Sequence, residues 1–297
     1  MLPDDLPQDL PTFITRFGSD EQCRDYLFRQ RWPEGFRCRA CGHDQAYALG
    51  RRNIYECRSC GQQHSLLKGT IFEQTKTGLA KWFLAIYLVT SSKGGIAATE
   101  LQRQMGFGSY QTAWAWLHKI RKAMIRPDRE RLAARVEADE TYVGAAQPGQ
   151  PGRGAAGKAV VAGAVEAGRG KARGRRLGRL RLVTPAAVAT DGWAGYAGLP
   201  AKGYDHEPVN LSATWGDAAL RLPAIHLVFG LAKRWLLGTH HGAVGKKHLP
   251  AYLDEFVFRF NRRTAKSISH RFARVVEHAV QTGPLSYRAL VAAPRPT

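Results

Sequence analysis

Cys38-Arg-Ala-Cys41 and Cys57-Arg-Ser-Cys60 are two Cys-x2-Cys pairs separated by 15 residues. A pair with this spacing forms a tight turn, or knuckle, whose two thiolates point the same way. Two knuckles joined by a short hairpin supply the four sulfur ligands that structural zinc prefers. The spacing therefore predicts a zinc ribbon in which Zn²⁺ is held by Cys38, Cys41, Cys57 and Cys60.

The residues around the two pairs agree with this prediction. Gly42 and Gly61 each follow a knuckle, where a tight turn favours a residue without a side chain. The alternative is four unrelated buried thiols. Cys23 lies outside the pattern, and we expect it to be a small core residue on a helix. With four thiolates available, His43 and His64 are interpreted as surface residues.

The composition indicates a globular and strongly basic protein. The 297 residues include 44 Lys and Arg against 24 Asp and Glu, a formal net charge of +20, and 44% are hydrophobic. Such a charge attracts polyanions, so nucleic acid is the first partner to consider and an anionic membrane the second. The most apolar stretch, 79–89, is too short to span a bilayer, and the acidic N-terminus does not resemble a secretory signal. We expect no membrane partner and a reducing cytoplasm.

Composition and periodicity divide the chain into four parts. We predict a multidomain α+β protein with a zinc ribbon and N-terminal helix over 1–70 and a small helical, helix-turn-helix-like domain over 71–130. An α/β domain follows over 131–265, and a basic C-terminal tail over 266–297.

The second part has helical periodicity in three segments. One helix is expected over about 79–91, a short one over 96–105, and a third from Ser109 to about Arg126. A tight second connection is consistent with a helix-turn-helix whose last helix enters a DNA major groove. The alternative is a plain helical core, in which Trp114 and Trp116 are simply buried.

The third part alternates as strands do. Residues 135–143 place Glu137 and Asp139 on one face, and further strands are expected over 158–166, 177–183 and 188–193. The last of these ends at Asp191, before a glycine. Carboxylates on neighbouring strands can hold two divalent cations for phosphoryl transfer, although an Asp-Gly pair is more often only a turn.

Four motifs resemble a known family. They are 136–144 (VEADETYVG), 190–196 (TDGWAGY), 233–242 (KRWLLGTHHG) and 252–263 (YLDEFVFRFNRR). In this order they resemble the ISXO-like group of DDE-type insertion-sequence transposases with an N-terminal zinc ribbon, and the resemblance spans about 24–263. It implies an RNase H-like catalytic domain, catalytic Mg²⁺ or Mn²⁺, and cleavage and joining of double-stranded DNA at terminal inverted repeats and target sites. It also implies a homodimer or larger synaptic complex at a bacterial nucleoid.

The resemblance also assigns catalytic roles. Asp139 and Asp191 match the two metal-binding aspartates, and His226 falls on the third position, which varies between Glu, Asn and His. Lys233 lies seven residues after His226, nearly two helical turns, so both share a helix face and the lysine is expected to hold a DNA phosphate. Without the family, His226 would be interpreted as a helix N-terminal histidine with a hydrogen bond in the core.

The sequence departs from the family between about Leu182 and Val188. Parallel strands need a connection of about a dozen residues or more, and there is no room for the first crossover helix. Two hypotheses follow: an active transposase, or an internally deleted and inactive zinc-ribbon DNA-binding protein. A weaker third hypothesis is a zinc-ribbon transcription regulator.

Other motifs leave open alternatives. Arg259, Arg262 and Arg263 are interpreted as a DNA-phosphate contact, with a solvated helix face as the alternative. His240 and His241 are expected in a glycine-bounded loop over 238–242. The segment 168–181 is either a solvated hairpin or a phosphate contact, and its basic residues are Arg169, Lys171, Arg173, Arg175, Arg176, Arg179 and Arg181.

Overall fold

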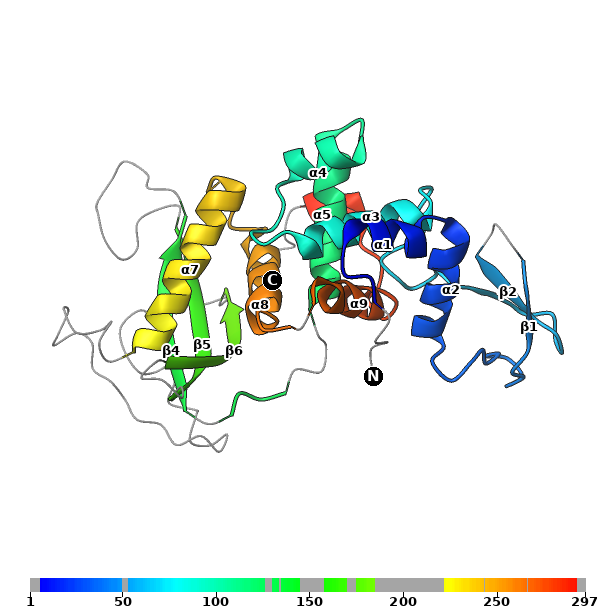
Figure 1. Ribbon diagram of the computed structural model, residues 1–297, viewed down its shortest axis with the longest axis horizontal. Coiled ribbons are helices and arrows are strands. Elements are labelled where there is room, and N and C mark those ends of the chain that lie inside the picture. Colours follow the sequence, from blue (N-terminus) through cyan, green and yellow to red (C-terminus); the bar gives the residue numbers. More distant parts are fainter. Residues whose placement is uncertain are drawn as a thin grey trace. The chain divides into compact units, whose positions relative to one another are not determined.

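The computed structural model is mixed α/β, with small sheets, and forms two compact units. It describes residues 6–49, 53–125, 130–133, 135–144, 158–169, 175–184, 222–242, 244–265 and 267–292. The first unit combines Met1–Asp128 with Arg262–Thr297, and the second is Arg129–Asn261 (Figure 1). No helix in the described part of the chain is both long and apolar enough to cross a bilayer.

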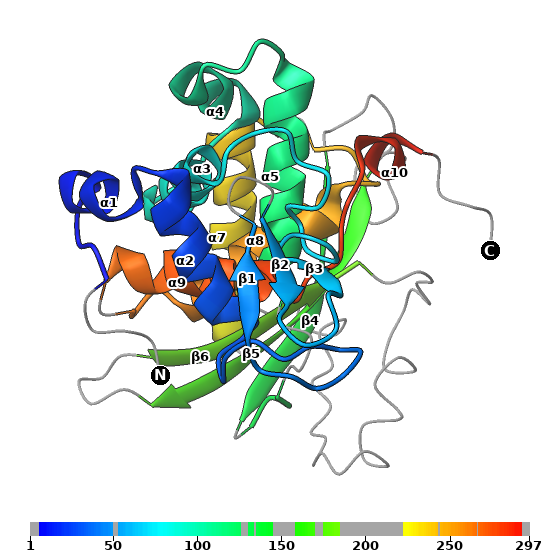
Figure 2. The same ribbon diagram turned by 90° about the vertical axis from the view of Figure 1, so that its right-hand side faces the viewer.

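The first unit contains seven helices and three strands among its described residues. The helices are α1 (Leu10–Phe17), α2 (Asp20–Arg31), α3 (Leu79–Ser91), α4 (Ala98–Met105), α5 (Tyr110–Met124), α9 (Ile268–Ala279) and α10 (Tyr287–Val291). The strands β1 (Ala46–Ala48), β2 (Ile54–Cys57) and β3 (Gln63–Ser65) pair antiparallel in chain order. Figure 2 shows these three strands side by side.

Local sequence signals explain where the first helices begin. The side chain of Asp9 accepts a hydrogen bond from the Thr12 amide, and that of Ser19 accepts one from the Gln22 amide. Both are capping boxes, which satisfy amides that have no partner within the helix. The three helices expected between residues 79 and 126 are present as α3, α4 and α5.

The core of the first unit joins residues from both ends of the chain. Phe13 and Phe17 of α1 pack their rings 5.2 and 5.4 Å from Phe272 of α9, and Phe83 of α3 lies 5.6 Å from it. The prediction of a basic tail over 266–297 was wrong for the described residues 267–292, because α9 buries an apolar face containing Phe272 and Val276. The N-terminal helix of the expected ribbon domain (1–70) and the expected helical domain (71–130) therefore share one core.

Helices α4 and α5 meet at a tight turn. Gly106 ends α4 in the left-handed conformation (φ 60°), which a glycine adopts without strain, and Ser109 caps α5. Trp116 of α5 stacks on Trp82 of α3 with ring centroids 3.5 Å apart. Most of α5 is buried, and its exposed residues are Tyr110, Gln111 and Thr112 in its first turn. Within α5, only that turn is exposed for the major-groove contact expected from the sequence.

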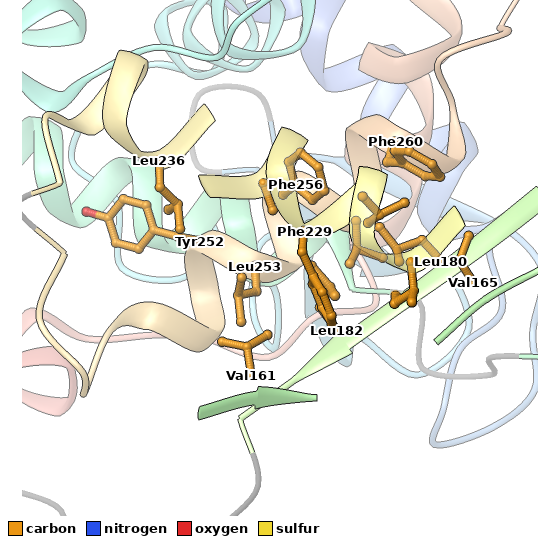
Figure 3. Packing of buried hydrophobic residues seen from close by; sticks show 14 of the residues in the cluster. Val161, Val165, Leu180, Leu182, Phe229, Leu236, Tyr252, Leu253, Phe256 and Phe260 are labelled. Carbon is orange, nitrogen blue, oxygen red and sulfur yellow. The ribbon is translucent and has the colours of Figure 1, made fainter. Parts of the chain in front are cut away.

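The second unit is a three-stranded sheet covered by two helices. Strands β4 (Val136–Val143), β5 (Ala159–Arg169) and β6 (Arg175–Val183) pair antiparallel in chain order, and α7 (Pro223–His240) and α8 (Leu249–Asn261) pack against them. Side chains of β5, β6 and both helices share one apolar core (Figure 3), including Val161, Leu182, Phe229, Leu253 and Phe256. Each such fully buried side chain contributes about 2 kcal/mol.

The three strands expected at 135–143, 158–166 and 177–183 are present as β4, β5 and β6. The fourth expected strand, at 188–193, lies outside the described residues, and so do Asp191 and most of the short connection at 182–188.

Candidate metal centre and catalytic site

The two cysteine knuckles have matching backbone geometry. The Gly42 amide donates to the Cys38 carbonyl at 2.9 Å, and the Gly61 amide donates to the Cys57 carbonyl at 3.0 Å. Both glycines have positive φ, 76° and 68°. This is the turn that the sequence requires after each knuckle, because residues with a side chain rarely adopt it.

The four thiols converge as zinc ligands would. All four sulfur atoms lie within 4.8 Å of one another, and the Cys38–Cys60 and Cys41–Cys57 sulfur distances are both 3.6 Å. A tetrahedron with Zn–S bonds of about 2.3 Å has edges of roughly 3.8 Å, so the geometry fits one zinc ion. In the described part of the chain, no other group of three or more His, Cys, Asp or Glu side chains converges in this way.

His64 belongs to this site, and its interpretation as a surface residue was wrong. It is half-buried at the end of the ribbon, with Nε2 3.3 Å from the Cys38 sulfur. Desolvation opposes ionisation of the Cys38 thiol, but hydrogen bonds from the Cys41 and Ala40 amides and from His64 lower its pKa to about 5. A thiolate is the form that binds zinc.

In the second unit, Glu137 and Asp139 lie on the same face of β4. Glu137 pairs with Val165 and Asp139 with Gly163 in the antiparallel register, and paired residues point to the same side. Val165 lies in the core beneath α7 and α8. Because side chains alternate between the two faces of a strand, Glu137 and Asp139 lie on the same face of β4. This is the face of the sheet that α7 and α8 cover.

The structure brings together two of the four predicted catalytic residues. The Nε2 atom of His226, in the first turn of α7, lies 3.4 Å from Oδ2 of Asp139. This nitrogen is buried and makes no hydrogen bond to the described residues. At this nitrogen, the described residues do not supply the core hydrogen bond of the alternative interpretation.

Gly163 lets α7 approach the sheet at this point. A Cβ atom there would lie 2.6 Å from the Phe229 ring and 2.9 Å from Leu182. Because Gly163 pairs with Asp139 and Phe229 lies one turn after His226, this close packing adjoins the Asp139–His226 pair.

Lys233 lies two turns further along α7, on the side that carries His226. Desolvation and the positive charge of Lys158 lower the pKa of its ammonium group. Both effects disfavour the charged form of this ammonium group.

A buried ion pair corrects the interpretation of Arg259 as a DNA contact. The Arg259 guanidinium lies 2.8 Å from Glu255, with side chains 9% and 0% exposed. Arg259 thus neutralises a carboxylate inside the second unit. Asn261 also has a structural contact, because its side chain bonds the Leu180 amide and carbonyl at 2.7 and 3.1 Å.

The expected loop at 238–242 is partly helical. His240 is the last residue of α7, and His241 caps the helix in the left-handed conformation. The His240 ring packs edge-on between Trp235 and Tyr252, at 4.9 and 4.7 Å. His240 therefore has a packing role at the end of α7.

Within the basic segment 168–181, Arg179 forms ion pairs with two carboxylates of the same unit. Its guanidinium lies 2.7 Å from both Glu166 and Glu130. The hydrogen bond from Arg179 outweighs desolvation and lowers the pKa of Glu166 to about 2. The hairpin tip at 170–174 lies outside the described residues.

This ion pair predicts an acid-labile second unit. Because the pKa of Glu166 is lower in the folded state than its ordinary value of 4.5, the stabilisation is complete above about pH 4.5 and is lost as the pH falls towards 2. Urea unfolding of wild type and Glu166→Gln at several pH values measures it. The wild type should lose more stability over this window than the variant, and parallel pH profiles would contradict the assignment.

Two family models match parts of this chain. Residues 131–261 match an ISXO2-like transposase domain, and residues 18–63 match a transposase zinc-ribbon domain. Together the two matches cover more than half of the chain. This protein belongs to the ISXO2-like transposase family.

A relative of this ISXO2-like transposase is an uncharacterized protein in the transposable element ISH50 of Halobacterium salinarum. It is 28% identical, and the match covers 83% of this chain and 92% of the relative. No solved structure matches the chain. The transposase domain begins just before β4 and ends with α8, so Asp139 and His226 both belong to it.

Proposed function

We propose that this transposase cleaves the ends of a bacterial insertion sequence and joins them to target DNA by metal-dependent phosphoryl transfer. The observation that carries the proposal is the meeting of Asp139 and His226 at 3.4 Å, from a strand and a helix 87 positions apart in the chain. The resemblance to DDE transposases supplies the reaction class and the RNase H-like fold.

The Asp139–His226 pair fits a divalent cation. Two neighbouring ligands of an octahedral ion, each about 2.1 Å from the metal, lie roughly 3 Å apart. The separation of 3.4 Å is close to this value, and the buried His226 nitrogen has no competing hydrogen bond to the described residues. Imidazole is a poor ligand for Mg²⁺, so we expect Mn²⁺ to bind at least as well.

Each proposed catalytic residue then has a role. Asp139 and Asp191 hold the cations, His226 binds one of them or positions the attacking water, and Lys233 holds a phosphate oxygen of the strand being cut. Bound divalent cations activate the attacking oxygen and stabilise the leaving one. Asp191 is included by family resemblance, since it lies outside the described residues.

Binding of double-stranded DNA is proposed for the first unit. The zinc ribbon and the exposed first turn of α5 are its candidate contacts, because recognition helices use their N-terminal residues to read bases. The net charge of +20 supports binding to phosphates. We infer a homodimer or larger complex at the nucleoid from the family, since transposition brings two ends together.

Replacing Asp139 is expected to stop the reaction without preventing DNA binding. With a duplex that carries the element's end, the unaltered protein should form cleaved and joined products in Mg²⁺ or Mn²⁺. Asp139→Asn and Asp191→Asn should slow this by about a thousandfold, since a metal supplies several kcal/mol of transition-state stabilisation. Glu140→Gln, a change on the opposite face of β4, is the control.

The second candidate function is an inactive DNA-binding protein derived from a transposase. The short connection at 182–188 favours it, because it leaves no room for a crossover helix. Specific duplex binding with no product from the unaltered protein, in either metal, would support this alternative and contradict the first.

A further inference from the structure

Glu137 is a buried carboxylate that the proposed reaction does not use. Its residue is 5% exposed, in β4 and two positions before Asp139. One of its oxygens, Oε2, accepts hydrogen bonds from the amides of Ala224 and Ile225, at 2.6 and 3.1 Å. Both amides belong to the first turn of α7.

The start of α7 has no cap of its own. Leu222 stands at the N-cap and makes no side-chain hydrogen bond to the helix, and Pro223 has no amide hydrogen. The next amides have no carbonyl partner within the helix. Glu137 satisfies two of them from a strand 87 positions earlier, and its negative charge complements the positive end of the helix dipole.

The contact between Glu137 and α7 adjoins both Asp139 and His226, the two residues of the candidate site. On β4, Asp139 is the next residue on the same face as Glu137, and on α7, His226 directly follows Ile225. One turn later, Phe229 packs over Gly163. The helix is thus fixed to the sheet by a charged hydrogen bond before His226 and by close packing after it.

We propose that Glu137 is a positioning residue, which sets the distance between His226 and Asp139 by holding the first turn of α7 on β4. The proposal rests on the function proposed above. Glu137 itself is not assigned as a metal ligand. Its Oε2 is already bonded to two amides, and within the described residues Glu137, Asp139 and His226 do not form a converging three-ligand group.

Amide hydrogen exchange tests the contact without any need for activity. In the full-length protein, the Ala224 and Ile225 amides should exchange slowly, although first-turn amides usually exchange fast. Glu137→Ala should speed their exchange by about tenfold, the usual effect of losing a helix cap. Glu137→Gln keeps an acceptor oxygen and a similar volume, so it should retain part of the protection even if the alanine variant folds poorly.

Glu140→Ala is the matched control. It removes a carboxylate from the exposed face of the same strand and should leave both amides unchanged. Exchange at Ala224 and Ile225 that is equal in Glu137→Ala, Glu140→Ala and the unaltered protein would overturn the proposal.

End cleavage tests the consequence for catalysis. Glu137→Ala should lower the rate at saturating DNA by at least about tenfold, with the Kd for DNA unchanged, and Glu137→Gln should restore part of the rate. Because Glu137 acts through His226, the Gln substitution should have little further effect in a His226→Ala background. Full activity of Glu137→Ala overturns the positioning role. No product from the unaltered protein refutes the proposed function instead, and the exchange data then decide whether Glu137 holds α7.

Discussion

Removing zinc should unfold the ribbon and abolish DNA binding. The three ribbon strands are only three or four residues long, so they bury too little apolar surface to hold the knuckles together. Zinc binding to a site of four cysteines contributes on the order of 10 kcal/mol, far more than such strands supply. A chelator should therefore release one zinc ion per chain and disorder residues 38–65.

Substitution of single cysteines distinguishes the zinc ligands from a cysteine that does not bind zinc. Cys57→Ser should lose the metal, whereas Cys23→Ala should retain it, because Cys23 is buried on α2 and its sulfur lies against the Phe17 carbonyl. The measurements are zinc content by elemental analysis and the fluorescence of Trp32, whose ring contacts Phe36 and Tyr55 at the ribbon. Retention of a full equivalent of zinc in Cys57→Ser would contradict the four-cysteine site.

Removing Arg259 should destabilise the second unit by about 3–5 kcal/mol. The variant Arg259→Ala removes a cation that lies 2.8 Å from the carboxylate of Glu255, which is 0% exposed. The cost comes mainly from the loss of this cation beside a buried carboxylate. Urea unfolding followed by circular dichroism measures it.

Two further variants make this test specific. Glu255→Gln combined with Arg259→Met removes both charges and should recover most of the lost stability. Arg274→Ala breaks the more exposed Arg274–Glu277 pair and should cost no more than about 1 kcal/mol. A small effect of Arg259→Ala, similar to that of Arg274→Ala, would contradict the buried-pair interpretation.

Features with a local signal could be predicted from the sequence. The Cys-x2-Cys spacing identified the four thiols that converge, and the alternation along 135–143 placed Glu137 and Asp139 on one face. Ser109 and Gly106 marked the boundaries of α5 and α4 for the same reason, since caps and left-handed turns depend on residues close in the chain.

Features that depend on distant contacts could not be predicted in this way. Nothing near Glu137 indicates that it caps α7, because its partners lie 87 and 88 positions later. The role of Arg259 likewise depends on the burial of its own helix, which charge alone does not show. Asp139 and His226 were paired by family resemblance, and their 3.4 Å contact required the structure.

Phe272 completes the aromatic cluster of Phe13 and Phe17. The first unit can therefore finish folding only after the C-terminal part of the chain has been synthesised. A ribosome must translate all of the second unit before the hydrophobic centre of the first unit can close. A frameshift after Asn261 would therefore yield an intact second unit attached to an incompletely folded first unit. Truncated copies of the gene should consequently encode proteins that cellular proteases remove quickly.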